Sequence, residues 1–296
     1  MNDLQKVELG ILKEYVILCE SLNLKYYLVC GSALGAVKYG GFIPWDDDID
    51  VAMPRRDYEV FLDCASKLLP EWCFVQNYRT NKEFHLIGTK LRDSRTTFVE
   101  YSCENLNINH GVFIDVFPLD SYLPQKDQQK KFAKMQKRIE AIRRVRLNYR
   151  RFTSREIFSL RNNYYYILYK LFGLYKNTDF YIAQYESFIS SGNSDESDII
   201  CNHANSIDKR DYSPKWHYGN GVSVEFEGLV VRIPENYDAY LTQKYGEWRA
   251  DLPSEEQKGH HYYVLCDLDK PYTSYFEYKN NGQAKFIGKI NTSIYR

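Results

Sequence analysis

Acidic residues recur at every second position of the segment DDDIDVAMP, which covers residues 46–54. This alternation of acidic and apolar residues predicts a strand with one polar face, which would carry Asp46, Asp48 and Asp50 together. Two carboxylates on one face can bind one or two hard divalent cations such as Mg²⁺ or Mn²⁺, which prefer oxygen ligands. A cation held in this way bridges phosphate oxygens and offsets the charge that develops during phosphoryl transfer. A solvated strand edge or turn is the alternative.

Asp115 could supply a third carboxylate from a neighbouring strand. It is an acid within the otherwise apolar segment GVFIDVFPL, residues 111–119. Burying such an acid costs free energy unless a cation compensates its charge. Asp120, which follows this segment directly, is the alternative to Asp115.

Gly31 and Ser32 form a short turn between the apolar segment KYYLVC and the helix-forming segment ALGAVK. A glycine turn that leads into a helix presents backbone N–H groups, which can hold the phosphates of a nucleotide. Arg55, Lys90 and Arg92 could contact the same phosphates, because cationic side chains bind them. Capping a helix or pairing with Asp57 is the alternative for Arg55.

Trp45, together with Phe42 and Tyr39, could form an aromatic wall that attracts a quaternary ammonium group. Packing of the loop is the alternative, since the chain contains 27 Tyr and 16 Phe. His260 and His261 could also face the site, but two adjacent residues of a regular element cannot both do so.

Around these residues the pattern predicts an α/β fold, with a mixed β-sheet flanked by helices. Apolar residues at helical spacing predict helices over residues 4–22, 55–69, 126–151, 162–175, 177–189 and 236–248. Short apolar or alternating segments predict strands over residues 25–31, 46–54, 73–78, 85–93, 96–101, 111–119, 198–204 and 222–234. We expect a catalytic core at residues 1–125, a basic and Tyr-rich helical insertion at 126–198, and a mixed C-terminal part at 199–296 that packs on the core.

The composition argues against several classes of protein. The 39 basic and 39 acidic residues give no net charge, and nothing else indicates nucleic-acid binding. The seven Cys are scattered and never spaced as CxxC, which argues against a disulfide framework or a cysteine zinc site. No segment reaches the roughly 18 unbroken apolar residues of a membrane span. We expect a cytoplasmic protein whose basic helix at 126–151 could contact anionic lipid at the inner face of the membrane.

Two segments carry a resemblance to a known family. The segment CGSALGAVKYGGFIPWDDDIDVAMPRRDYEVF, residues 30–61, resembles the signature of the LicD family, which includes the fukutin-related transferases. The segment FEGLVVRIPENYDAYLTQKYGEW, residues 226–248, is similar to the closing motif of that family. The resemblance implies a nucleotidyltransferase-type fold and Mg²⁺-dependent transfer of a phospho-alcohol group from a CDP-activated donor to a sugar hydroxyl. Phosphocholine from CDP-choline is the expected cargo, with ribitol phosphate or glycerol phosphate as alternatives.

The resemblance also implies roles for individual residues. Asp48, Asp50 and Asp115 would bind the metal, and Asp46 would be a further acid of the DxDxD pattern. The acceptor hydroxyl would attack the phosphorus that bears the alcohol, and CMP would leave. Asp115 is the hypothesised base, with metal-assisted activation of the hydroxyl as the alternative. The acceptor would be a saccharide of teichoic acid, capsule or lipopolysaccharide type, and it could be lipid-linked.

Two other functions stay open from the residues alone. The first is transfer of a nucleoside monophosphate to a small hydroxyl compound. The second is a nucleotide-binding scaffold that has lost catalysis, although the four intact acids argue against it.

Overall fold

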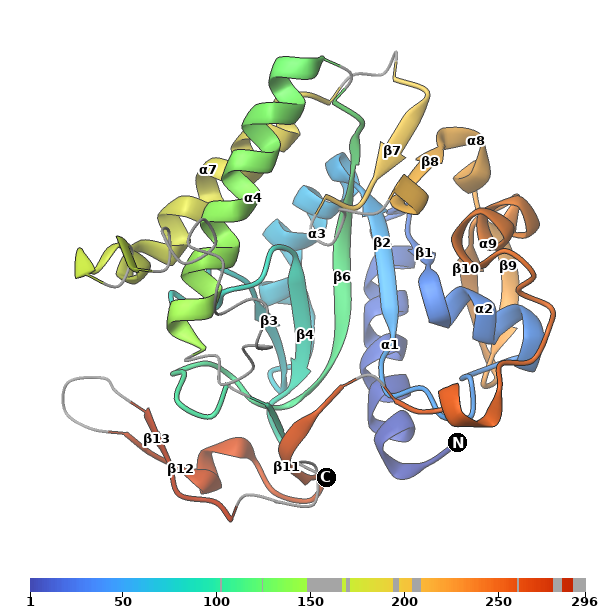
Figure 1. The fold of residues 1–296 in the computed structure, drawn as a ribbon. Helices are drawn as coiled ribbons and strands as arrows, with labels where there is room; N and C mark the ends of the chain where they lie inside the picture. Colours follow the sequence, from blue (N-terminus) through green and yellow to red (C-terminus); the bar gives the residue numbers. More distant parts are fainter. Residues whose placement is uncertain are drawn as a thin grey trace.

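A seven-stranded mixed sheet forms the centre of the fold in the computed structural model (Figure 1). The structure describes residues 1–101, 103–123, 125–147, 167–168, 171–193, 197–203, 209–259, 261–278 and 284–289. The strand order is β1-β2-β6-β4-β3, with β7 beside the end of β6 and β8 beside β7. Only β2 and β6 are parallel to each other; the other pairs of this sheet are antiparallel. The strands are β1 (Tyr27–Leu28), β2 (Asp50–Pro54), β3 (Cys73–Gln76), β4 (Thr89–Asp93), β6 (Val112–Ser121), β7 (Ile199–Cys201) and β8 (Tyr212–Pro214).

The helices α1 (Asp3–Ser21) and α3 (Arg55–Leu68) pack against this sheet and against each other. In α1 the side chain of the N-cap residue Asn2 accepts a hydrogen bond from the Gln5 backbone N–H, and the Gln5 side-chain oxygen accepts one from the Asn2 backbone N–H. This reciprocal capping fixes the start of the helix. The predicted apolar stripes are buried as expected, and they include Ile11, Tyr15, Leu18, Tyr58, Phe61 and Ala65.

Helix α2 (Cys30–Tyr39) follows β1 and ends at Gly40, whose φ of +67° suits glycine. It packs against α9 (Tyr237–Tyr245) and against the hairpin of β9 (Val222–Phe226) and β10 (Leu229–Ile233). The single strand predicted over residues 222–234 is therefore wrong. Glu227 and Gly228 both have positive φ and form a tight turn, so the segment makes two strands.

Helix α4 (Lys126–Arg146) lies beside α7 (Thr178–Ser190), next to the short helix η1 (Leu174–Asn177) (Figure 1). Its predicted apolar stripe is buried at Phe132, Ile139 and Ile142, while Lys131 and Lys134 are exposed. Burial of this stripe explains why so basic a segment forms a helix. Half of the helix predicted over 162–175 lies outside the described residues, and its last two residues belong to η1. None of the described helices combines the length and apolarity that crossing a membrane requires.

The C-terminal part returns to the sheet region. Helix α8 (Lys215–Tyr218) follows β8, and β11 (Tyr263–Asp267) pairs with β5 (Thr97–Glu100). The hairpin of β12 (Phe276–Tyr278) and β13 (Ala284–Phe286) packs on the same region through Phe276, which is buried beside Val99. These pairings bring residues after 199 against the segments that carry the predicted acids. The expected mixed α/β class is confirmed, whereas the division at residues 125 and 198 stays a prediction.

Candidate active site

Asp50 and Asp115, which come from separate segments of the sequence, are direct neighbours in the sheet. The parallel strands β2 and β6 place the Asp50 Cα opposite the Asp115 Cα, and the Asp115 N–H donates to the Ile49 carbonyl at 2.9 Å. Because side chains alternate along a strand, both carboxylates share one face of the sheet with Ala52 and Phe117. The predicted convergence of acids from two adjacent strands is therefore present in the backbone register.

Asp46 and Asp48 do not belong to the strand that the alternation predicted. Strand β2 begins only at Asp50, and residues 46–49 are irregular, because β1 has two residues and its register covers only Val51 and Ala52. The acids converge nevertheless. The Asp46 carboxyl hydrogen-bonds with Asp48, and the charge of Asp115 contributes to raising the pKa of Asp48, after burial and against the opposing charge of His261.

Gln5 of α1 holds this irregular segment in place. Its side-chain amide donates to the Asp46 carbonyl at 2.9 Å and to the Ile43 carbonyl at 3.4 Å. One turn further along α1, Glu8 is 2 % exposed, and its Oε2 has no hydrogen-bond partner. Burial raises the pKa of Glu8 well above its ordinary value, and the charges of Asp48, Asp47 and Asp46 raise it further.

The acids of this cluster lack sufficient positive charge around them. Burial, and then the charges of Asp48 and Asp115, raise the pKa of Asp50 well above its ordinary value. Burial, and then Asp48, raise the pKa of Asp46 to about 7. Hard divalent cations bind such oxygen clusters and remove the mutual repulsion. The oxygen donors of Asp48, Asp50 and Asp115 are of the kind that Mg²⁺ or Mn²⁺ prefers, whereas among the described residues the group whose ligand atoms all lie within 4.8 Å of one another is Asp47, Asp48 and His261.

Two cationic side chains lie beside the acids. The Lys90 Nζ is 3.3 Å from the Asp115 Oδ2 and 3.4 Å from the Glu100 Oε1. The His261 Nδ1 is 3.4 Å from Asp47 and 3.7 Å from Asp48. Lys90 thus contacts a predicted metal ligand inside the protein.

The sequence did not decide whether His260 or His261 faces the acids. Burial lowers its pKa, but the hydrogen bond to Asp47 and the charge of Asp48 outweigh burial and raise that pKa to about 9. Asp47, Asp48 and His261 also offer ligand atoms that all lie within 4.8 Å of one another. His261 lies two residues before β11, and its backbone N–H donates to the Asp47 Oδ2 at 3.0 Å, which holds it beside the acids.

Gly31 and Ser32 form the first turn of α2, where the sequence placed them. The Ser32 hydroxyl accepts a hydrogen bond from the Asp50 N–H at 2.9 Å, so this side chain positions the acid. A Cβ on Gly31 would come within 2.7 Å of the Asp46 Oδ2, so a larger residue there would displace the Asp46 carboxylate. The preceding residue, Cys30, has a φ of +51°, a strained conformation for a residue other than glycine.

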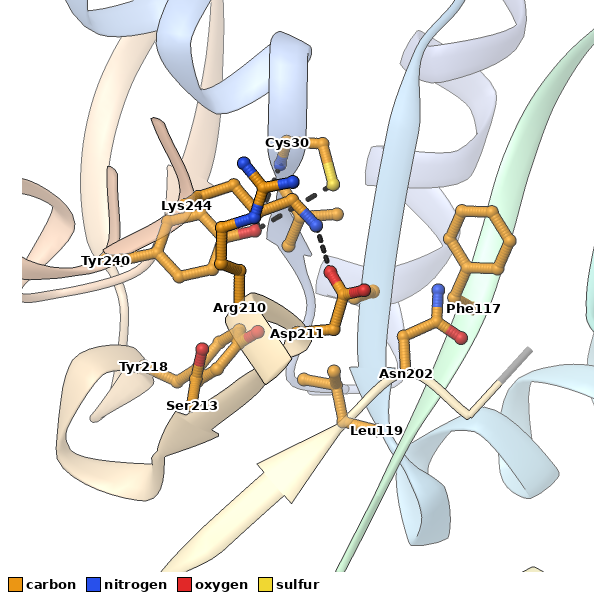
Figure 2. Close-up of a pocket in the computed structure, with 12 residues that line it drawn as sticks. Cys30, Phe117, Leu119, Asn202, Arg210, Asp211, Ser213, Tyr218, Tyr240 and Lys244 are labelled. Carbon is orange, nitrogen blue, oxygen red and sulfur yellow. Dashed lines mark hydrogen bonds and ion pairs between the residues drawn. The ribbon is translucent and has the colours of Figure 1, made fainter. Parts of the chain in front are cut away.

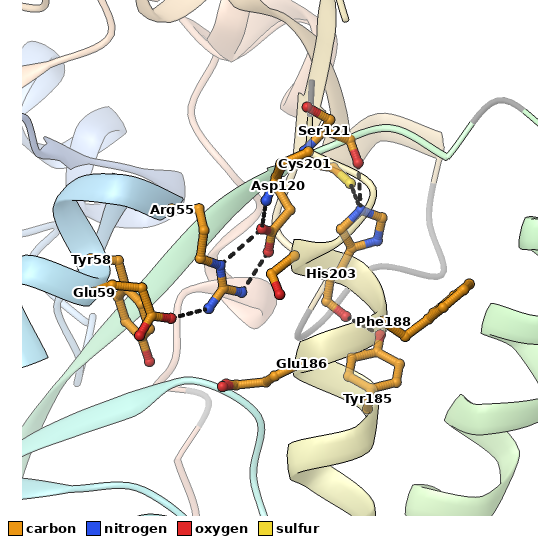
Figure 3. Close-up of polar contacts among 12 residues, drawn as sticks. Arg55, Tyr58, Glu59, Asp120, Ser121, Tyr185, Glu186, Phe188, Cys201 and His203 are labelled. Atoms are coloured by element: carbon orange, nitrogen blue, oxygen red, sulfur yellow. Dashed lines mark hydrogen bonds and ion pairs between the residues drawn. The ribbon is translucent and has the colours of Figure 1, made fainter. Parts of the chain in front are cut away.

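Arg92 and Arg55 are engaged inside the protein. Arg92 is fully buried and donates to Gln76, the Gly111 carbonyl and Glu100 at 2.5–2.7 Å. Arg55 makes two hydrogen bonds to Asp120, at 2.6 and 2.9 Å, as Figure 3 shows. These contacts occupy both guanidinium groups and do not favour the predicted role of Arg55 and Arg92 in binding donor phosphates. That role stays a prediction.

Trp45 is half-buried in the turn before the acids and contacts the ring of Tyr39 edge to face at 6.4 Å. Phe42 is buried against Phe226, with ring centroids 4.9 Å apart. Phe42 therefore packs the core and is not part of an aromatic wall. A role for Trp45 in binding the donor stays a prediction.

A cavity lies on the same face of the sheet, two residues along the strands from Asp50 and Asp115. Figure 2 shows residues that line it. Ala52 and Phe117, which follow Asp50 and Asp115 on their strands, line it together with Cys30. Its volume is about 80 Å³. The opposite wall comes from residues that the sequence did not single out: Asn202, Arg210, Asp211, Ser213, Tyr218, Tyr240 and Lys244.

The opposite wall of this cavity is polar and connected to the acids. Lys244 forms an ion pair with Asp211, and the charge of Asp50 contributes to raising the pKa of Lys244 against the effect of burial. The Tyr240 hydroxyl accepts a hydrogen bond from the Cys30 N–H at 3.1 Å. Two cations and one acid on this wall favour an anionic ligand over a quaternary ammonium group.

Comparison with known proteins supports a family assignment. Residues 23–161 match the model of the LicD/FKTN/FKRP nucleotidyltransferase domain. The chain is 28% identical over 270 residues, 88% of its length, to the lipopolysaccharide cholinephosphotransferase LicD of Haemophilus influenzae, of which 96% is covered. An uncharacterized protein of Rickettsia prowazekii is 40% identical over 50 residues, which are 17% of each chain. One of Rickettsia typhi is 34% identical over 73 residues, 24% of this chain and 22% of the relative. The domain match and the similarity along most of the chain show a LicD/FKTN/FKRP nucleotidyltransferase domain at residues 23–161 and support the assignment to the LicD family of phosphotransferases.

Proposed function

We propose that the chain transfers a phospho-alcohol group from a CDP-activated donor to a hydroxyl of a saccharide acceptor and releases CMP. Phosphocholine is the proposed cargo, and an acceptor of lipopolysaccharide type is the first candidate, because the Haemophilus influenzae relative is named for both. Mg²⁺ or Mn²⁺ is the proposed cofactor, and the cytoplasm, at the inner face of the membrane, is the proposed location.

The register of Asp50 against Asp115 is the observation that carries this proposal. It supports a site in which these two acids and Asp48 would hold a divalent cation. A divalent cation held by these residues would supply positive charge that stabilises the negative charge of the donor's phosphates. A scaffold without catalysis would have no need for buried acids that repel one another, since each costs free energy.

The side chains around the acids suggest how the site would position its substrates. Lys90 fixes the Asp115 carboxylate, which we propose as the base that takes the proton of the acceptor hydroxyl. His261, with a pKa of about 9, carries a positive charge at neutral pH and would attract the donor phosphates toward Asp48. Lys244 would contact the donor's phosphates from the opposite wall of the cavity.

The assay incubates the purified chain with Mg²⁺, lipopolysaccharide and CDP-choline, CDP-glycerol or CDP-ribitol in parallel, and measures CMP and the modified acceptor. We expect CMP from CDP-choline and phosphocholine on the acceptor. Teichoic acid and capsule fragments replace lipopolysaccharide in further reactions. Asp48→Asn, which keeps the shape of the side chain but removes its charge, is the control for catalysis.

Two results would contradict the proposal. Equal rates for wild type and Asp48→Asn would remove the catalytic role of the acid cluster. Consumption of a nucleoside triphosphate with release of pyrophosphate would instead indicate transfer of a nucleoside monophosphate.

A further inference from the structure

A second, larger groove lies further along the same two strands. It has a volume of about 510 Å³, within the usual range of about 300–1000 Å³ for ligand sites. Its lining includes the cationic side chains Lys25, Arg55, Arg56 and Lys215 and no acidic side chain. A groove with this lining attracts anions.

The charges behind the lining leave the groove positive. Arg55 is neutralised by Asp120, as described above. Asp57 lies near Lys25 and Arg56, and both lower its pKa against the larger effect of burial. The Lys25 Nζ donates to the neutral Asn220 side chain at 3.0 Å. The lining itself therefore carries four cationic side chains and no acidic one, while Asp120, Glu59 and Asp57 lie behind it and offset part of this charge.

The groove is continuous with the candidate active site. Leu119 and Tyr218 line both the groove and the cavity beside the acids. Pro54 and Leu119 are paired in register, four residues beyond the pair of Asp50 and Asp115 and on the same face of the sheet. At about 3.3 Å per residue, the groove begins about 13 Å from the acids.

We infer that this groove binds an anionic group, a phosphate or a carboxylate, on the saccharide acceptor. The inference rests on the proposed function. The anionic part of a CDP-activated donor is its diphosphate, which belongs at the acids and their cation, so the anion in the groove comes from another molecule. An acceptor whose hydroxyl reacts at the acids and whose anionic group lies about 13 Å away must be an extended chain.

The test compares wild type with the double variant Lys25→Gln, Arg56→Gln. The acceptor is a phosphorylated oligosaccharide released from lipopolysaccharide, used before and after treatment with phosphatase. We expect the double variant to raise the KM for the phosphorylated acceptor about tenfold, as loss of two partly exposed charge contacts would. The kcat and the KM for the donor stay unchanged, and the dephosphorylated acceptor has the same high KM with both proteins. Lys67→Gln, an exposed lysine at the other end of α3, is the matched control.

Calorimetric binding of the same oligosaccharides separates this inference from the proposed function, because it needs no turnover. If wild type releases no CMP from any CDP-alcohol, the proposed function fails, while binding still tests the groove. Equal affinity of wild type and the double variant for the phosphorylated oligosaccharide overturns the inference. The inference is also overturned if the double variant keeps its affinity for the oligosaccharide and loses binding to vesicles that contain phosphatidylglycerol. The anion in the groove would then be a lipid head group.

Discussion

Asp115 and Asp120 lie five residues apart on one strand, and the structure gives them opposite roles. Asp115 belongs to the candidate metal site, whereas Asp120 is fully buried in a bidentate ion pair with Arg55 (Figure 3). Replacing each with asparagine keeps the size of the side chain and removes its charge. The two variants therefore test the assignment of the site separately from the stability of the fold.

We expect Asp120→Asn to lower the free energy of unfolding by about 3 kcal/mol. Breaking a buried ion pair typically costs about 3–5 kcal/mol, because the remaining charge is left without its partner. The lower end applies here, since Arg55 keeps a second ion pair with Glu59 at 3.1 Å. Mg²⁺ should still stabilise this variant, and the folded fraction should keep its activity.

Asp115→Asn should have the opposite profile. Lys90 keeps its contact with Glu100 at 3.4 Å, and repulsion from Asp48 and Asp50 is relieved. We expect the free energy of unfolding without Mg²⁺ to stay within about 1 kcal/mol of wild type. Activity should be lost, together with the stabilisation by Mg²⁺.

Urea unfolding with and without MgCl₂ measures both effects. At a Mg²⁺ concentration of 100 times the Kd, wild type and Asp120→Asn should gain about 2.7 kcal/mol, and Asp115→Asn should gain little. Activity at saturating donor is the second readout. An equal response of both variants to Mg²⁺ would refute the placement of the metal at Asp115.

Three further predictions concern other parts of the structure. Burial lowers the pKa of His110 to about 4, below its usual 6.5, so its contribution to stability is complete above pH 6.5 and is lost as pH falls toward 4. The free energy of unfolding should fall by about 3 kcal/mol across this pH range. In His110→Gln the free energy of unfolding, measured in urea, should depend less on pH in this range, and the same pH dependence as in wild type would contradict the prediction. Gly31→Ala should lower the free energy of unfolding by about 1–3 kcal/mol and weaken stabilisation by Mg²⁺, because the new Cβ displaces Asp46; normal Mg²⁺ dependence in thermal unfolding would count against it. Arg92→Met should destabilise the fold by at least about 3 kcal/mol because Glu100 loses a buried partner, and a loss in urea unfolding below 1 kcal/mol would argue against that role.

The elements that depend on local sequence could be predicted from it. The apolar stripes of α1 and α3 include the buried residues Ile11, Tyr15 and Phe61. Each stripe extends over only a few helical turns, so residue spacing alone decides which side chains share a face. The acids of the site were also found from the sequence, because Asp115 interrupts an apolar strand and the DDDID segment carries a family signature.

The tertiary structure decided which distant residues meet and what each charge does. Local sequence patterns could not predict the register of β2 against β6, the approach of His261 to Asp48, or the cavity wall that includes Lys244. Each depends on contacts between segments far apart in the chain. The same holds for the two arginines predicted to bind phosphate, Arg55 and Arg92. A guanidinium group can bind a substrate or a protein acid equally well, and only packing determines which anion lies within reach.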